Sequence, residues 1–266
     1  MNFLQWTNFT MERPTAYGWF HLMFLALTFI SCVFVIVFGR KNSLKTVNRV
    51  VFAFGIFLAI IETYKQLFFT YINYGGVYSV YNFPFQFCSV PIYVCLFAPF
   101  IKNEKVQNWF YNFLALYALL AGLTVMFYPG DVFSTQGSIS IHSMLWHSSM
   151  VIIGVYIITS RQIGKSFKEV LKGYSVFLGF VFVALIGFDI VLYKLLNTHI
   201  NMFYVSPYYI TTMTVFNTIQ TNCGWAVMFL SYLFGFFLGA VIIWSFAKLI
   251  RVICNKIKNK GIKKLI

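Results

Sequence analysis

Acidic side chains are scarce in this sequence. Only six of its 266 residues are Asp or Glu, against 20 Lys or Arg, and charged residues make up 10% of the chain. Soluble domains carry about 25% charged residues. Apolar residues reach 60%, aromatic residues reach 21%, and the mean hydropathy is +0.77. This composition excludes a disordered chain, a coiled coil and a nucleic-acid module spread over the whole chain. It indicates one polytopic, all-α membrane domain.

The motifs of common metal and nucleotide chemistry are also missing. The five cysteines form no C-x-x-C pair, so their spacing suggests neither a disulfide framework nor a zinc site: Cys32, Cys88, Cys95, Cys223 and Cys254. The sequence contains no phosphate-binding glycine loop, no dinucleotide fingerprint and no H-E-x-x-H motif. We therefore expect neither a metal site nor a cofactor.

Apolar runs long enough to cross a bilayer recur along the chain. A spanning helix needs about 20 apolar residues, and this window predicts seven spans, at residues 17–38, 50–72, 84–101, 109–127, 140–160, 172–195 and 226–248. The third run is the weakest, because it is short and contains Pro84, Pro91 and Pro99. Residues 197–225 are polar and aromatic, and we expect an ordered, partly re-entrant loop there. Residues 1–248 then form a single seven-helix domain, followed by a basic tail at 249–266.

Basic residues gather in alternate connections between the predicted spans. They lie around residues 40–49, 102–105 and 161–172, and seven more follow from Lys248 onward. Cytoplasmic connections of membrane proteins carry such an excess of Lys and Arg, so we expect the C-terminus in the cytoplasm and the N-terminus outside. The tail is expected to contact anionic lipid headgroups. Its charge thus has an explanation in membrane orientation, and we expect no nucleic-acid partner.

Five ionisable residues stand out inside the predicted spans: Glu62, Lys65, His142, His147 and Asp189. Such residues cost about 2.5–3.5 kcal/mol each to insert and tend to mark function. At about 1.5 Å per helical residue, Lys65, His147 and Asp189 fall about 10 Å below the outer surface. This common depth predicts one polar cavity that opens toward the outer side.

Each of these residues also has a structural explanation. Glu62 and Lys65 are three residues apart, so they either neutralise each other on one helix face or act directly. Asp189 either pairs with Lys65, caps a broken helix or takes part in function. His142 is nearer the interface and is expected to be wetted. The deeper His147 is either a hydrogen-bonded interior residue or a base.

Cys88 differs from the other cysteines in its surroundings. It follows Pro84 and Gln86 at an expected helix start, where the helix dipole favours the thiolate. A cysteine and a histidine at similar depth are the minimal arrangement for acyl-thioester chemistry. Cys32 and Cys95 need no such role, because a buried free cysteine behaves as a small apolar residue.

Three short motifs resemble those of a known family. Residues Pro84-Phe85-Gln86-Phe87-Cys88-Ser89 resemble the P-L-H-x-C motif of the YwaF-type bacterial integral-membrane family, which is related to the eukaryotic transmembrane protein 164, an acyltransferase of ether phospholipids. Residues 141–148 are similar to the family's helix that ends in Ser-His-Gly, and residues 201–204 to its N-Y-M-x-L segment. Gln86 replaces a usual histidine, and Ser148 replaces a usual glycine.

The resemblance implies a lipid acyltransferase of the bacterial plasma membrane. Cys88 would be the nucleophile and His147 the general base, acting on a phospholipid or lysolipid near the outer leaflet. The developing oxyanion would be stabilised by Gln86, Ser89 or Asn201.

Two other functions remain open from the residues alone. In a transporter or solute-binding subunit, Glu62, Lys65 and Asp189 would form the polar site. In a receptor or non-catalytic scaffold, the loop at 197–225 would bind a ligand, although the short cytoplasmic connections offer little surface for a signalling partner.

Overall fold

A computed structural model describes residues 3–263, with all their side chains except those of Cys254 and residues 257–263. Most of the described residues are helical, and none of them forms a β-strand; Thr10 and Gln136 make one isolated bridge. Six helical runs among them are long and apolar enough to cross a membrane: Trp19–Gly39, Leu44–Asn73, Glu104–Phe127, Gly137–Arg161, Lys168–Leu196 and Thr214–Ile253. The expectation of an all-α membrane protein is confirmed.

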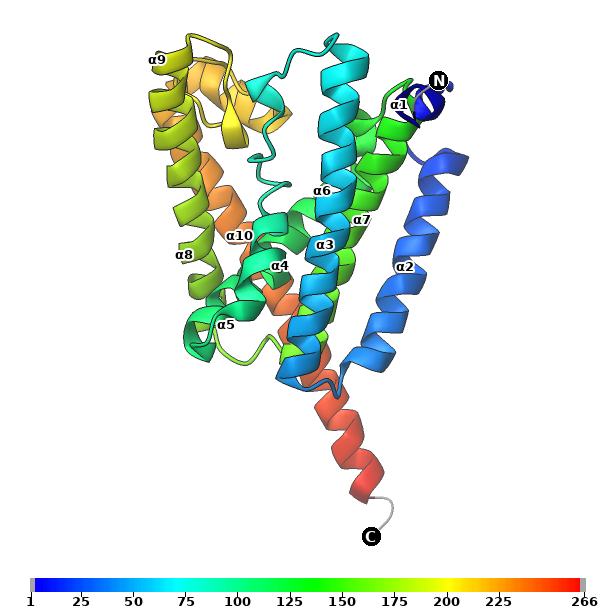
Figure 1. Ribbon diagram of the computed structural model, residues 1–266. Coiled ribbons are helices and arrows are strands. Elements are labelled where there is room, and N and C mark those ends of the chain that lie inside the picture. Colours follow the sequence, from blue (N-terminus) through cyan, green and yellow to red (C-terminus); the bar gives the residue numbers. More distant parts are fainter. Residues whose placement is uncertain (1–2, 264–266) are drawn as a thin grey trace.

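The elements follow one another up and down the molecule (Figure 1). The first half contains α1 (Phe3–Thr7), α2 (Trp19–Gly39), α3 (Leu44–Phe68) with the π-helical turn η1 (Phe69–Asn73), η2 (Val80–Asn82), α4 (Pro91–Phe97), η3 (Ala98–Phe100), α5 (Glu104–Phe113), π-helical η4 (Leu114–Ala118) and α6 (Leu119–Phe127). The second half contains η5 (Pro129–Val132), α7 (Gly137–Arg161), α8 (Lys168–Phe182), π-helical η6 (Val183–Leu192), α9 (Tyr193–Leu196), η7 (Met202–Tyr204) and α10 (Thr214–Lys263).

The third predicted span is not a continuous helix. Residues 83–90 are non-helical, and only Pro91–Phe97 and Ala98–Phe100 coil into short helices. Proline disfavours helix in the residue before it and lacks an N–H to continue one, so α4 begins at Pro91. In Figure 1 the chain descends from the upper end of α3 through this irregular stretch into α4. Residues 74–90 are called the re-entrant segment below. They begin exposed at 74–78 and place non-helical backbone inside the bundle at 84–90.

The last helix begins earlier than the sequence indicates. Residues 214–223 are helical, so the expected loop at 197–225 is wrong for its final part, whereas 197–213 is the predicted ordered loop. The misjudged boundary lies at Gly224, whose φ of 83° breaks the helical path. A residue without Cβ adopts this angle readily. The backbone then stays helical to Lys263, so the basic tail continues α10, while the side chains of 257–263 and residues 264–266 lie outside the described part.

Packing between helices depends on small residues. Helix α7 contacts α2, α6 and α3, and α5 contacts α8. A Cβ added at Gly122 on α6 would lie 3.0 Å from the carbonyl oxygen of His147 on α7, and one at Gly154 would lie 2.6 Å from the Cβ of Leu119. Glycines at such crossings let membrane helices approach closely. Helix α7 is thereby fixed at the centre, and it carries both candidate histidines.

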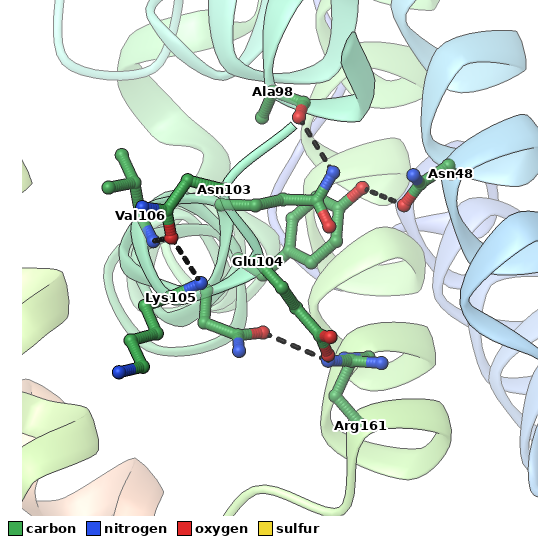
Figure 2. Close-up of polar contacts among 10 residues, drawn as sticks. Asn48, Ala98, Asn103, Glu104, Lys105, Val106 and Arg161 are labelled. Carbon is green, nitrogen blue, oxygen red and sulfur yellow. Dashed lines mark hydrogen bonds and ion pairs between the residues drawn. The ribbon is translucent and has the colours of Figure 1, made fainter. Parts of the chain in front are cut away.

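Polar contacts hold the lower end of the bundle together (Figure 2). Arg161 at the end of α7 contacts Glu104 of α5 at 2.7 Å, and Gln107 donates a hydrogen bond of 2.9 Å to the carbonyl of Ala98. Asn103 caps α5 by accepting from the backbone N–H of Lys105 at 3.0 Å. These contacts fix α4 and η3 from below and thus fix the re-entrant segment that precedes them.

Candidate functional site

The re-entrant segment is bound to the 201–206 loop by Gln86. Its side-chain amide donates to the carbonyl of Asn201 at 2.8 Å, and its Oε1 accepts from the backbone N–H of Phe203, also at 2.8 Å. Asp189 adds a third contact from η6, because its Oδ1 accepts from the N–H of Met202 at 2.6 Å. The sequence-predicted residues Gln86, Asn201 and Asp189 therefore meet around one loop.

The backbone of this loop is strained. Phe203 has φ of 56° and Tyr204 has φ of 59°, a left-handed conformation that bulky residues rarely adopt. Asn201 is buried and its Oδ1 accepts from the N–H of Ser206 at 3.1 Å. Such strain persists only where surrounding contacts over-determine the conformation, and it clusters at functional sites. Here the surrounding contacts come from Gln86, Asp189 and Asn201.

Cys88 lies two residues beyond Gln86 in the same segment. Its backbone carbonyl accepts a hydrogen bond of 2.7 Å from the indole Nε1 of Trp146, the neighbour of His147 on α7. Its thiol interacts with the hydroxyl of Ser89. The candidate nucleophile is thus attached to the helix that carries the candidate base.

His147 is buried and has a defined tautomer. Its Nδ1 lies 2.7 Å from the carbonyl oxygen of Ser143. A carbonyl only accepts, so Nδ1 carries the proton and the neutral ring keeps its lone pair on Nε2. An imidazole in this form is ready to accept a proton. No hydrogen bond joins it to the Cys88 thiol among the described side chains.

His142 is not the wetted surface residue that the sequence indicated. Its side chain is 7% exposed, its ring stacks on Trp146 with centroids 5.6 Å apart, and its Nε2 is buried without a hydrogen-bond partner. The depth estimate failed because α7 begins at Gly137 and is enclosed by α2, α3 and α6. Both histidines are therefore interior residues.

Glu62 and Lys65 form an ion pair on α3. Lys65 Nζ lies 2.8 Å from Glu62 Oε1, which also accepts from the side-chain amide of Gln66 at 2.6 Å. Gln66 donates further to the carbonyl of Asn82 at 2.5 Å, and this contact joins α3 to the re-entrant segment. The neutralising pair that the sequence left open is present, while Glu62 Oε2 remains buried without a partner.

The charge of Lys65 connects the separate parts of the site. It acts electrostatically on the Cys88 thiol and on the imidazoles of His142 and His147. Asp189 is outside this group: in the part of the chain that the structure describes, it forms no ion pair with Lys65, and its Oδ2 is buried and unpartnered. The predicted single cavity is therefore two adjoining polar groups. One surrounds Lys65, and the other surrounds the 201–206 loop.

Sequence reasoning missed three contributors to this geometry. Gln66 lies one helical turn from Glu62, a spacing that could have indicated it. Trp146 was identifiable as the neighbour of His147. Tyr204, whose hydroxyl hydrogen-bonds Tyr81, had no such signal, because that contact spans the loop and η2. The described residues contain no group of three or more metal-ligating side chains.

Comparison with known proteins gives one match. The sequence profile of the TMEM164 family matches residues 16–246, a range that runs from the start of α2 into α10 and includes every candidate residue above. No curated protein and no solved structure matches the chain. Because the matched range covers most of the sequence, the chain belongs to the TMEM164 family.

Proposed function

We propose that this protein is a membrane-embedded lipid acyltransferase that carries its acyl group as a thioester on Cys88. The observation that supports this most is the attachment of Cys88 to α7. Cys88 lies in non-helical backbone inside the bundle, and its backbone carbonyl accepts a hydrogen bond from the indole of Trp146. The sequence neighbour of Trp146 is His147, whose Nε2 is free to accept a proton. Nucleophile and base therefore come from two elements that this hydrogen bond joins.

The reaction divides into two transfers. His147 Nε2 takes the proton of the Cys88 thiol, and the thiolate attacks the ester carbonyl of a donor phospholipid. The carbon–oxygen ester bond breaks, the leaving lysolipid oxygen takes the proton from His147, and the acyl group stays on sulfur. An acceptor hydroxyl then gives its proton to His147 and attacks the thioester, so that the thiol is restored with a proton from His147.

Neighbouring residues have assigned roles in this proposal. Burial raises the pKa of the Cys88 thiol, and the charge of the cationic Lys65 partly offsets this and favours the oxyanion, while Ser89 supplies a hydroxyl next to the thiol. Gln86 uses both atoms of its amide on the 201–203 backbone, so we assign it to positioning, together with Asn201 and Asp189. Glu62 fixes the ammonium of Lys65.

The proposal also includes a location. With the N-terminus outside and the C-terminus in the cytoplasm of a bacterial plasma membrane, the upper end of Figure 1 faces outward. Cys88 would then be reached from the outer leaflet, and the substrates would be phospholipids or lysolipids there.

A transporter site built from Glu62, Lys65 and Asp189 has less support. Glu62 and Lys65 neutralise each other, and Asp189 is engaged by the N–H of Met202 rather than by Lys65. A substrate site would need these three side chains directed at one ligand.

The decisive experiment is intact-protein mass spectrometry of purified full-length protein after incubation with defined phospholipids. We expect a mass increment of one acyl chain that hydroxylamine removes. Cys88→Ala should abolish the increment, whereas Cys32→Ala and Cys95→Ala should retain it. An unmodified protein whose Cys88 still reacts with an alkylating reagent would refute the thioester mechanism.

A further inference from the structure

A cavity lies at the lower end of the molecule, far along α3 from the candidate catalytic residues. It has a volume of about 390 Å³ and is bounded by the first two turns of α3 and by η3. Its lining includes Lys45, Arg49, Phe52, Pro99 and Phe100. The volume falls within the range of about 300–1,000 Å³ that is typical of small-ligand pockets.

The charged side of this cavity is basic and unpaired. Lys45 and Arg49 are four residues apart and so lie on the same face of α3, and both are exposed. Neither forms an ion pair with any described residue, although Arg161 and Lys65 elsewhere each have a carboxylate partner. Two cations on one wall without an acidic partner complement an anion.

The rest of the cavity lining is apolar and aromatic. The rings of Phe52 and Phe100 meet edge to face with centroids 5.1 Å apart, and Phe100 is 65% exposed. An exposed phenylalanine beside two cations, at the end of a spanning helix, matches the boundary between lipid headgroups and acyl chains. A free phosphate would leave this apolar wall unused.

The walls are held in place before any ligand binds. Asn48 donates to the carbonyl of Pro99 at 3.1 Å and accepts from the hydroxyl of Tyr111 at 2.7 Å. Figure 2 shows Asn48 at the edge of the polar network that also includes Ala98 and Arg161. The distance between α3 and η3, and therefore the width of the cavity, is fixed by these contacts.

We propose that this cavity binds one anionic phospholipid, with its phosphate at Lys45 and Arg49 and the start of an acyl chain along Phe52 and Phe100. Basic pockets between spanning helices are known to hold anionic headgroups. The cavity is large enough for the glycerophosphate part of a lipid, and the remaining chain extends along the exposed face of α3. The site is independent of the proposed acyl transfer.

The test is native mass spectrometry of the full-length protein in detergent. Phosphatidylglycerol is compared with phosphatidylcholine of the same acyl chains and with soluble glycerol 1-phosphate. We expect one phosphatidylglycerol to bind at least tenfold more tightly than either alternative. The double variant Lys45→Gln/Arg49→Gln should lose about tenfold in affinity, whereas the matched control Arg40→Gln/Lys41→Gln, two exposed cations outside the cavity, should stay within twofold.

A second variant separates a lipid from a free phosphate. Phe100→Ser changes an exposed side chain, so the fold should persist. The variant should bind phosphatidylglycerol more weakly, whereas its affinity for glycerol 1-phosphate should be unchanged. Cys88→Ala should bind lipid as the unaltered protein does, which keeps this test distinct from that of acyl transfer. Equal affinity for the two lipids, an equal loss in the control pair, or glycerol 1-phosphate binding as tightly as the lipid would each overturn the proposal.

Discussion

The indole nitrogen of Trp146 donates a 2.7 Å hydrogen bond to the backbone carbonyl of Cys88, 58 residues earlier in the chain. Through this contact the non-helical segment that holds the thiol is attached to the central helix α7. The same indole stacks on His142 and is the sequence neighbour of His147. Trp146 therefore connects the candidate nucleophile with both histidines, and the first prediction concerns this bond.

Trp146→Phe should keep an aromatic ring beside His142 and remove the hydrogen bond to the Cys88 carbonyl, together with part of the buried indole. A hydrogen bond of this kind contributes about 0.5–1.5 kcal/mol, so acylation of Cys88 should slow roughly twofold to tenfold. Time-resolved intact-mass measurement gives the rate. Trp244→Phe is the control, because that indole donates to Glu169 at the opposite end of the bundle and its loss should leave the rate unchanged. Equal rates in the two variants would contradict a positioning role for Trp146.

Gln86→Leu should destabilise the protein by about 2 kcal/mol, since it leaves the carbonyl of Asn201 and the N–H of Phe203 without partners. Gln86→Glu keeps an acceptor for Phe203 but sets a carboxylate against the carbonyl oxygen of Asn201, so it should destabilise the protein as well. Thermal unfolding followed by tryptophan fluorescence in detergent compares them, and we expect both variants to melt at a lower temperature than the unaltered protein. A Gln86→Leu variant with the same melting temperature as the unaltered protein would show that the 201–206 loop does not depend on this side chain.

Gly55→Ala should separate α3 from α4, because the added Cβ would lie 2.9 Å from the backbone atoms of Cys95 and Leu96. Overpacking of this kind costs about 1–3 kcal/mol. Gly179→Ala on α8 is the matched control: nothing lies within 4 Å of its added Cβ, so the better helix propensity of alanine should leave stability equal or slightly higher. The melting temperatures of the two variants should therefore move apart, and equal melting temperatures would count against the close approach of α3 and α4.

Lys65→Met should destabilise the protein more than the loss of the whole ion pair does. It leaves the buried carboxylate of Glu62 uncompensated, at a cost of about 3–5 kcal/mol, whereas Glu62→Gln/Lys65→Met removes both charges and should recover most of the stability. Melting temperatures of the two single variants and the double variant complete the cycle. If Cys88 acylation stays slow in the stable double variant, the charge of Lys65 serves chemistry as well as folding. Additive losses would mean that the two side chains do not interact.

The membrane character and most of the helices followed from the sequence because they depend on local hydrophobicity. A spanning segment needs a run of apolar residues of fixed length, and six such runs became the expected helices. The boundaries failed where a single backbone angle decides the path, as at Gly224, and where prolines replace a helix with irregular backbone, as at residues 83–90. The orientation in the membrane, which rests on the distribution of Lys and Arg, stays a prediction.

The candidate residues themselves were visible in the sequence, since an ionisable group within an apolar run is conspicuous. The pairing of Glu62 with Lys65 was also within reach, because both lie on one helix face. The sequence did not show which residues meet across elements. The two bonds from Gln86 to the 201–203 backbone, the bond from Trp146 to Cys88 and the burial of His142 all join segments distant in sequence. Hydrophobicity is a property of each segment alone, whereas these contacts depend on how helices pack, and only the tertiary structure decided them.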